Sequence, residues 1–381
     1  MRIALTFPGC HRRGGVERVV FECARFLASR KHQVSVFANE WEALPNSGIE
    51  YHSVPVRESP ALMKPLRYYS ACRNAICSAG IQALGAHGCE CPLDGVYWTH
   101  SVHRAWLEAS KQFRSPFSAA RIKQRLNPLH SVLLHLEARH LRDRRYKKVI
   151  ALSSTVKADL MRWYDVPESD IQILPNGYSP EDFSAERRTS LRGEMRAKLG
   201  FGHEDRVVIF VANELQRKGF RPLVQAIASL QDRRLRLLVV GKVSPTDHCD
   251  EIEKLGLAPQ VKFAGPSSDI AAYYAAADIF ALPTQYEAWG LVIVEALACG
   301  LPVLTSRLAG AAVAVREGET GELIDRPLDA SEIASKLDLI LDRTFAAEAT
   351  TPEEIEASVA AYSWSTVLER YEAILSDCFE Q

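Results

Sequence analysis

Short apolar runs and helically spaced apolar residues alternate along the first half of the chain. Ile3–Phe7 and Gln33–Ala38 are apolar runs of strand length, and Val16–Arg30 between them carries apolar residues at helical spacing. The pattern predicts further strands at Val96–Thr99, Val149–Leu152 and Ile171–Leu174, and a helix at Val156–Tyr164. Strands that alternate with helices predict a parallel sheet covered by helices, which is the arrangement of a doubly wound α/β domain.

The alternation begins again after a polar, charged stretch at 180–204. It predicts strands at Arg206–Ala212, Arg236–Val240, Val261–Phe263, Ile279–Leu282 and Val303–Thr305, and helices at Pro222–Leu230, Ile270–Ala277 and Leu291–Cys299. A chain of 381 residues is longer than one hydrophobic core usually supports. We therefore expect two domains, 1–178 and 179–362, and a C-terminal segment, 363–381, that contains a last helix, Thr366–Cys378.

Composition and charge narrow the function classes. The formal net charge of −1 argues against a general nucleic-acid binder. No apolar run reaches the roughly 18–20 residues that a transmembrane helix needs. The apolar N-terminus, Met1–Phe7, is short and is more typical of a first strand than of a signal peptide. These features favour a cytoplasmic protein.

Most of the nine cysteines lie among apolar residues in the sequence, which is typical of reduced, buried thiols. Cys89 and Cys91 are the only close pair, with Cys77 and His87 nearby. A spacing of one residue is not the usual arrangement of zinc ligands. We therefore expect a loop with incidental cysteines, and no metal site.

Residues 287–295 carry the strongest chemical signal. Glu287 and Glu295 stand eight positions apart, and Gly290 precedes an apolar run that reads as a helix. The preceding text, up to Pro283, looks like the end of a strand. A strand end followed by a glycine and a helix N-terminus is a place where backbone N–H groups hold phosphate. The two carboxylates would lie at different depths along one elongated ligand.

This stretch, with Asp278–Pro283 before it and Ala296–Val303 after it, resembles the signature of the retaining, nucleotide-sugar-dependent glycosyltransferases of family 4. The resemblance implies the GT-B fold: two Rossmann-like doubly wound parallel-sheet domains facing a cleft, with a C-terminal helix that returns to the first domain. It also assigns roles: Glu295 would bind the ribose hydroxyls, Glu287 would contact the transferred sugar, and Gly290, Leu291 and Val292 would hold the donor, the first two through N–H groups to phosphate.

Two further motifs fit the family. Gly14 and Gly15 stand between a strand and a helix, where the family closes over the donor phosphates; taken alone the pair is a tight turn. Arg217 and Lys218 follow the first strand of the second domain, where two cations can stabilise a leaving diphosphate without a metal. The family usually has Gly-Arg-Leu earlier in this loop, whereas this chain has Ala212-Asn213-Glu214; some bacterial lipopolysaccharide core glucosyltransferases are similar in this respect.

Weaker signals lie at other strand ends. Gly241 with Lys242 and Gly265 with Pro266 resemble the positions where the family places the nucleotide base. His103, and after it His100, resemble a histidine that contacts the donor sugar in the family. A lone histidine is as often a structural hydrogen-bonding group, and that alternative stays open.

A basic segment occupies residues 111–150, with eleven Lys or Arg and only two acids, Glu137 and Asp143. Such a segment suits an anionic membrane surface, contacted through 121–148, or a phosphorylated acceptor. The alternative is a solvated helix face with no partner.

The pattern as a whole predicts a retaining, metal-independent glycosyltransferase. It would move a hexose from a nucleotide-diphosphate sugar, best a UDP-sugar, to a surface glycan or glycolipid such as lipopolysaccharide core. We expect no cofactor, no nucleic-acid partner, and a cytoplasmic enzyme at the inner face of the membrane. The alternatives are a GT-B sugar-nucleotide epimerase and a non-catalytic nucleotide-sugar-binding protein. A nicotinamide dehydrogenase is disfavoured because no Gly-x-Gly-x-x-Gly follows a strand.

Overall fold

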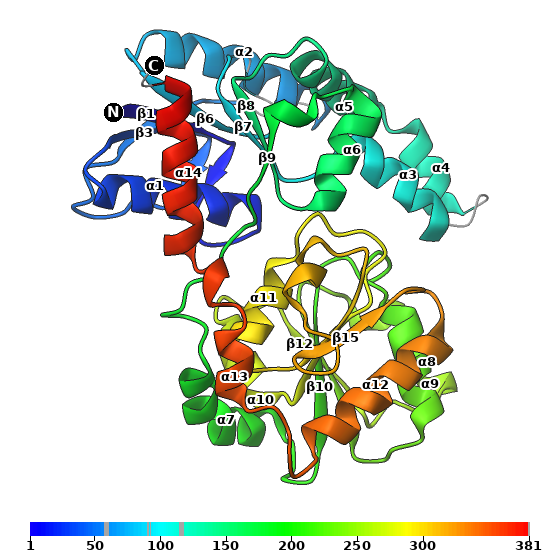
Figure 1. Cartoon of the computed structure of the whole chain (residues 1–381). Coiled ribbons are helices and arrows are strands. Elements are labelled where there is room, and N and C mark those ends of the chain that lie inside the picture. Colours follow the sequence, from blue (N-terminus) through cyan, green and yellow to red (C-terminus); the bar gives the residue numbers. More distant parts are fainter. Residues whose placement is uncertain (57–60, 90, 92, 114–117, 380–381) are drawn as a thin grey trace. The chain divides into compact units, whose positions relative to one another are not determined.

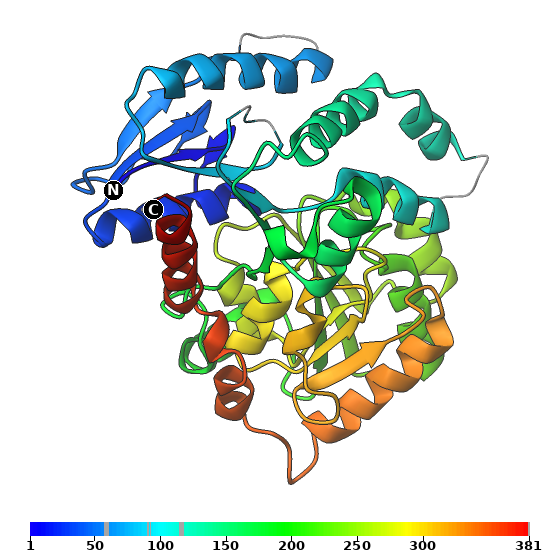
Figure 2. The same ribbon diagram turned by 45° about the horizontal axis from the view of Figure 1, so that its top comes forward.

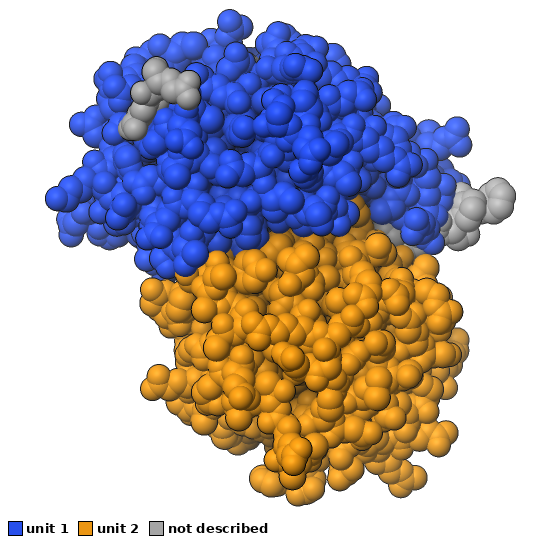
Figure 3. Space-filling model, in the orientation of Figure 1, with its two compact units in different colours: residues 1–176, 364–381 blue, residues 177–363 orange. Residues whose placement is uncertain are grey.

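The computed structural model describes residues 1–56, 61–89, 91, 93–113 and 118–379 (Figure 1). The chain divides into two compact units, coloured separately in Figure 3. Unit 1 is formed by residues 1–176 together with 364–381, and unit 2 by residues 177–363. The sequence-based boundaries lie at 178/179 and 362/363, close to these positions. Within the described residues, no helix is long and apolar enough to cross a bilayer.

Unit 1 is built on a seven-stranded, all-parallel sheet, because its apolar strand runs are joined by helical crossovers. In spatial order the strands are β5 (Glu50–Ser53), β3 (Gln33–Ala38), β1 (Arg2–Thr6), β6 (Ala83–His87), β7 (Val96–Thr99), β8 (Lys148–Ala151) and β9 (Ile171–Ile173). A separate pair joins β2 (Gly9–Cys10) and β4 (Glu40–Trp41). The central strands are buried, as expected for a sheet with helices on both faces.

Seven α-helices belong to the described part of unit 1. They are α1 (Val16–Ser29), α2 (Lys64–Cys77), α3 (His103–Phe113), α4 (Ala119–Leu126), α5 (Pro128–Leu141), α6 (Ser154–Tyr164) and α14 (Trp364–Phe379). The last helix, α14, packs beside α1 and over β6 and β7, which Figures 1 and 2 show in red against the blue helix. Tyr371 of α14 is fully buried there. The C-terminal helix is thus part of the first unit's core.

Unit 2 repeats the architecture with a six-stranded parallel sheet. In spatial order its strands are β12 (Val261–Gly265), β11 (Leu235–Val240), β10 (Arg206–Val211), β13 (Ile279–Leu282), β14 (Val303–Ser306) and β15 (Gly321–Ile324). Its helices are α7 (Ala185–Leu199), α8 (Phe220–Leu230), α9 (Cys249–Lys254), α10 (Ile270–Ala276), α11 (Leu291–Ala298), α12 (Ala330–Thr344) and α13 (Pro352–Ala357). The expectation of two Rossmann-like parallel-sheet domains is confirmed.

The polar, charged stretch at 180–204 contains the helix α7. This helix packs on α10, although apolar periodicity did not indicate it. Arg192 and Arg196 instead pair with the buried Asp278 and donate to backbone carbonyls at the end of α10. Long arginine side chains can pack through their aliphatic stems while their guanidinium groups are paired. The contact between α7 and α10 therefore depends on charged residues, which apolar periodicity does not indicate.

Candidate active site

The strand order of unit 2 reverses between β10 and β13, and this is the place where ligands bind in open α/β sheets. The loops that follow these two strands are joined by backbone hydrogen bonds. The Gln285 N–H donates to the Arg217 carbonyl at 2.9 Å. Gly219, with φ +79°, approaches Pro283 so closely that a Cβ would lie 2.1 Å from the Pro283 carbonyl oxygen. Only glycine fits this approach, so the two loops form one fixed surface.

Glu287 stands at the centre of this surface and contacts both cations of the β10 loop. Its carboxylate receives the Lys218 ammonium and lies 3.4 Å from Arg217 Nη1. Its backbone carbonyl accepts from the Gly310 N–H at 2.9 Å, which fixes the loop from the other side. Glu287 and Lys218 are both mostly buried, with side-chain exposures of 17% and 12%. Such a pair is strongly held, because desolvation strengthens the attraction between the charges.

Arg217 is anchored by three acceptors. Its Nη1 donates to the Tyr286 carbonyl at 2.6 Å as well as facing Glu287, and its Nε pairs with Glu214 at 2.7 Å. Burial lowers the pKa of the Lys218 ammonium well below its usual range, and the adjacent Arg217 guanidinium lowers it further, while Glu214 opposes the shift. Contact with the Glu287 carboxylate favours the charged form of Lys218.

The helix α11 begins at this point with Gly290 as its N-cap and no side-chain cap. Gly290 has φ +100°, and a Cβ there would lie 3.1 Å from Glu287 Cγ. The first N–H groups of a helix, here from Leu291 and Val292 onward, have no acceptor within the helix and carry its positive end. Glu295, one turn later in α11, is only 2% exposed. The structure thus combines a helix N-terminus, two cations and two carboxylates, as the sequence suggests.

The remaining predicted donor residues of unit 2 lie at the same sheet edge. Gly241 has φ +148°, and a Cβ there would lie 2.0 Å from the Ala212 carbonyl oxygen. The Gly241 N–H donates to the Gly265 carbonyl at 3.0 Å. The Lys242 N–H donates to Asn213 Oδ1 at 2.8 Å. These bonds join the loops after β10, β11 and β12, whereas Pro266, the residue after Gly265, is exposed.

In unit 1 the glycine pair lies at the start of α1, after β1. Gly14 has φ +100°, and its missing Cβ makes room for the Glu17 carboxylate. Gly15 is the N-cap of α1 and has no atom within 4 Å of the position of a Cβ. Both glycines are exposed. The pair therefore offers an open backbone at a helix N-terminus within unit 1.

The two predicted histidines each belong to a histidine pair. His103 Nε2 lies 3.1 Å from His130 Nδ1, and His100 Nε2 lies 3.0 Å from His87 Nδ1. Burial lowers the pKa of His103 to about 4, with His130 acting in the same direction. Burial, followed by the charge of His87, lowers the pKa of His100 well below its usual range. Both rings are therefore neutral near pH 7 and act as hydrogen-bonding groups.

Family comparisons cover both units. The model for glycosyl transferases group 1 matches residues 192–354, and the model for glycosyltransferase family 4 matches residues 13–182. Both models describe glycosyltransferases, and the chain is similar to the family-4 glycosyltransferases in both of its units. The lipopolysaccharide glucosyltransferase WaaG of Escherichia coli K12 is 27% identical over 326 residues, which is 84% of this chain and 84% of that protein.

Solved structures of the GT-B fold extend the likeness over the whole chain. The crystal structure of WaaG, a glycosyltransferase involved in lipopolysaccharide biosynthesis, has a TM-score of 0.79 at 24% identity and covers 98% of this chain and 99% of that chain. HepE of Anabaena in complex with UDP-glucose has a TM-score of 0.74 at 21% identity, with 99% and 100% covered. The solved structures therefore show the GT-B fold, and the family models that match both units show that the chain is a glycosyltransferase.

Glu137 is a structural residue of this glycosyltransferase that sequence reasoning did not single out for a site. It is 3% exposed on α5, and its carboxylate accepts the backbone N–H groups of His103 at 2.8 Å and Arg104 at 3.3 Å. It also accepts the Tyr164 hydroxyl. Burial raises the pKa of Glu137, and these donors oppose the shift. Its one available signal was that it is an acid in a basic segment.

Among the described residues, no group of three or more His, Cys, Asp or Glu side chains is arranged so that it could hold a metal ion. Cys89 and Cys91, the close pair in the sequence, form no disulfide in the described part of the chain, and neither do Cys77 and Cys72. The positive charges at the switch point come from Arg217 and Lys218.

Proposed function

We propose that this glycosyltransferase moves a hexose from a UDP-sugar to a lipopolysaccharide core saccharide or a related surface glycolipid, with retention of anomeric configuration and without a metal ion. The observation that carries the proposal is the contact of Lys218 and Arg217 with Glu287 at the N-terminus of α11. The lipopolysaccharide glucosyltransferase activity of the E. coli relative supports the acceptor class. The UDP-glucose complex of HepE supports the donor class.

The donor diphosphate would bind where the α11 N–H groups, Lys218 and Arg217 converge. Lys218 now holds Glu287, so an arriving phosphate exchanges one anion for another at the ammonium. That exchange releases the Glu287 carboxylate to accept hydrogen bonds from hydroxyls of the transferred sugar. Glu295, deeper in α11, would accept from the ribose hydroxyls.

Transfer breaks the bond between the anomeric carbon and the phosphate oxygen and forms a bond from the acceptor hydroxyl oxygen on the same face of the sugar. The electron pair of the breaking bond goes to the leaving diphosphate, and the proton of the acceptor hydroxyl passes to a phosphate oxygen. Negative charge grows on the diphosphate as the bond breaks. Fixed cations and helix N–H groups stabilise this charge in the transition state because they need no reorganisation.

Membrane association would place the enzyme at the cytoplasmic face of an anionic bilayer through 121–148. Helix α4 supports this proposal: Ile122 is 51% exposed and Leu126 is 74% exposed, beside Lys123 and Arg125. Exposed apolar side chains among cations are typical of an interfacial helix.

The test is a thermal-shift screen of the whole protein with UDP-, GDP- and ADP-sugars, followed by product analysis. We expect UDP-sugars to raise Tm most, since ligands that bind the native state stabilise it. Transfer should persist in EDTA, and NMR should show an unchanged anomeric configuration in the product. If incubation with donor alone interconverts the sugar, the protein is an epimerase instead. Inversion of the product would exclude the retaining route.

A further inference from the structure

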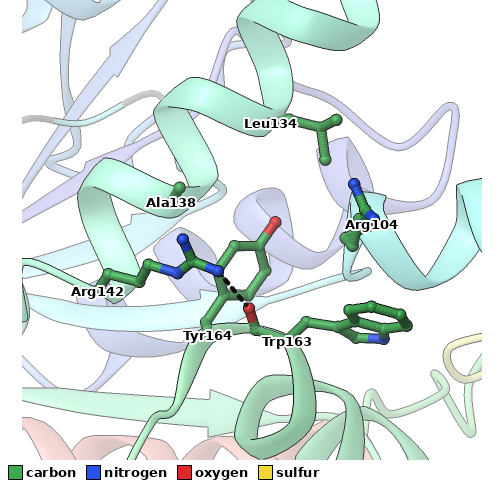
Figure 4. A pocket seen from close by; sticks show the side chains of 6 residues that line it. All are labelled: Arg104, Leu134, Ala138, Arg142, Trp163 and Tyr164. Atoms are coloured by element: carbon green, nitrogen blue, oxygen red, sulfur yellow. Dashed lines mark hydrogen bonds between the residues drawn. The ribbon is translucent and has the colours of Figure 1, made fainter.

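A cavity of about 360 Å³ lies within unit 1. It is formed by α3, α5, the residue after α5, and α6, and its lining is mainly apolar apart from two guanidinium groups (Figure 4). The lining residues are Arg104, Leu134, Ala138, Arg142, Trp163 and Tyr164. Its volume is in the range of small-ligand pockets.

Three guanidinium groups lie around Trp163, and two of them, those of Arg104 and Arg142, line the cavity. The Arg104 guanidinium lies 5.2 Å from the indole centroid, and that of Arg162 lies 4.8 Å from it. Arg142 Nη2 donates to the Trp163 backbone carbonyl at 3.2 Å, the bond drawn in Figure 4. In that view Arg104 and Arg142 approach from opposite sides, and Leu134 lies above them. The cavity thus combines cations at its rim with an apolar wall.

Carboxylates compensate these cations only in part. Within the described part of the chain, no carboxylate comes within 4 Å of the Arg142 or Arg162 guanidinium, and Arg104 has only Glu108, at 3.6 Å. That pair is exposed at Arg104 and partly exposed at Glu108, so solvent screens it and it contributes little. Glu137, the nearby buried acid, already accepts from two backbone N–H groups and from Tyr164. Positive charge therefore remains available to an anion from outside.

The cavity walls are also fixed before any ligand arrives. Glu137 of α5 binds the first turn of α3 and the last residue of α6, so one carboxylate holds all three helices. Arg142 is held at the end of α5 by Trp163 and lies 5.8 Å over the Tyr164 ring. Preorganised donors lose little conformational entropy on binding.

We propose that this cavity binds a phosphate group carried by the acceptor saccharide, with Arg142 and Arg104 as its ligands. The inference deepens the proposed function and rests on it for the identity of the acceptor. Guanidinium groups match the geometry of phosphate oxygens, and an apolar wall suits the carbon face of a sugar ring. A lipid headgroup presents the same phosphate chemistry. The guanidinium groups beside the apolar wall favour the saccharide, whereas the exposed apolar residues of α4 offer a separate surface suited to lipid.

The test measures binding of a delipidated, phosphorylated lipopolysaccharide core oligosaccharide, and of the same oligosaccharide after removal of phosphate with hydrofluoric acid. Calorimetry is done on the whole protein without donor. The variants are Arg142→Gln and Arg142→Lys. The matched control is Arg139→Gln, which removes the same charge from α5 at a site outside the cavity, where Arg139 lies over Tyr69. Thermal unfolding and UDP-glucose affinity of each variant show that the fold and the donor site are intact.

We expect the wild type and Arg139→Gln to bind the phosphorylated oligosaccharide about tenfold or more tightly than the dephosphorylated one, as for a charge-assisted hydrogen bond. Arg142→Gln should lose this preference, and Arg142→Lys should keep part of it. Equal losses in the two Gln variants, or no preference in the wild type, would overturn the proposal.

A second measurement separates the two phosphate sources. If Arg142→Gln weakens sedimentation with vesicles of phosphatidylglycerol and phosphatidylcholine yet binds the oligosaccharide like the wild type, the cavity serves a lipid and the saccharide assignment is wrong. Unchanged vesicle binding with weaker oligosaccharide binding supports it. Because calorimetry needs no turnover, a protein that transferred no hexose would still pass or fail this test, so the two proposals fail separately.

Discussion

The carboxyl edges of the two parallel sheets differ in the side chains that they carry. In unit 2 the edge carries paired charges, with Lys218 and Arg217 on Glu287, and glycines that bring loop backbones into contact. In unit 1 the edge carries histidine pairs, such as His87 and His100, whose desolvation favours the neutral form. A leaving diphosphate needs fixed positive charge, whereas a sugar hydroxyl needs neutral hydrogen-bonding groups. The paired charges of the unit 2 edge and the neutral histidine pairs of the unit 1 edge are thus suited to different parts of the reaction.

Removal of Lys218 should show this difference most strongly. Lys218→Met should lower kcat by about 100-fold or more, because the leaving group loses a desolvated cation. Initial rates at saturating donor measure the effect. Lys254→Met, which removes an exposed lysine at the end of α9, is the control and should leave kcat unchanged. A kcat for Lys218→Met within about threefold of wild type would show that the paired charges at this edge are structural only.

Within unit 2, Glu287 and Glu295 should affect different steps, namely transfer and nucleotide binding. Glu287→Gln should lower kcat about tenfold or more with little change in the Kd for UDP, because the carboxylate acts on the transferred sugar. Glu295→Gln should weaken UDP binding about tenfold, because a buried acceptor for the ribose hydroxyls becomes an amide. Steady-state rates and calorimetry with UDP separate the two effects. The reverse result would exchange the two roles.

The glycines of the two edges should differ in stability. Gly219→Ala places a Cβ 2.1 Å from the Pro283 carbonyl at φ +79°, and should lower the free energy of unfolding by about 2 kcal/mol or more. Gly15→Ala has open space around the new Cβ and an ordinary φ of −94°, so it should leave stability nearly unchanged or slightly raised. Urea unfolding measures both. Equal losses would mean that the unit 1 glycine pair is as tightly packed as the unit 2 loop.

Acid should lower the free energy of unfolding of unit 1 through its buried histidines. Burial lowers the pKa of His87 to about 3, and burial together with Arg145 lowers that of His140 to about 4. The unfolded chain takes up protons near pH 6.5, which the folded chain does not, so this stability is present above that pH and is lost as the pH falls toward 4. The free energy of unfolding should fall by about 1.4 kcal/mol per pH unit for each histidine in this window.

Urea unfolding at several pH values in that window measures the slope. His140→Asn should flatten it, whereas His203→Asn should not, because the His203 side chain is fully exposed in the folded chain. A slope that stayed the same in His140→Asn would show that this ring takes up its proton in the folded state.

Sequence reasoning located elements best where apolar runs alone decide them. The predicted limits of β3, β7 and β13 are those of the structure, because these strands are buried among helices and consist mainly of apolar residues. It failed for α7, whose contacts depend on Arg192, Arg196 and Asp278. The charges that hold this helix only become visible when residues some eighty positions apart are brought together, as the structure does for Arg196 and Asp278.

The residue types of the candidate site could be predicted from the sequence, but the contacts between these residues could not. The motifs around Glu287 and Lys218 indicate phosphate chemistry because carboxylates, cations and glycines stand at strand ends. That Lys218 holds Glu287 depends on the strand order of unit 2, which brings the β10 and β13 loops together. In the same way, His103 could be named from its strand end, but its capping by Glu137 joins residues 34 positions apart.

Helix α14 has a consequence for the synthesis of the protein. The chain leaves unit 1 after Asn176 and returns at Trp364, and Gly85 of β6 has no side chain where the Tyr371 hydroxyl packs; a Cβ there would lie 2.0 Å from that oxygen. A ribosome adding 5–20 residues per second would need roughly 10 to 40 s to make unit 2 before α14 emerges. For that time the first unit exists as an incomplete domain with an open apolar groove. The order of translation therefore delays the completion of unit 1 until the end of synthesis, whereas all residues of unit 2 have been made before α14 emerges.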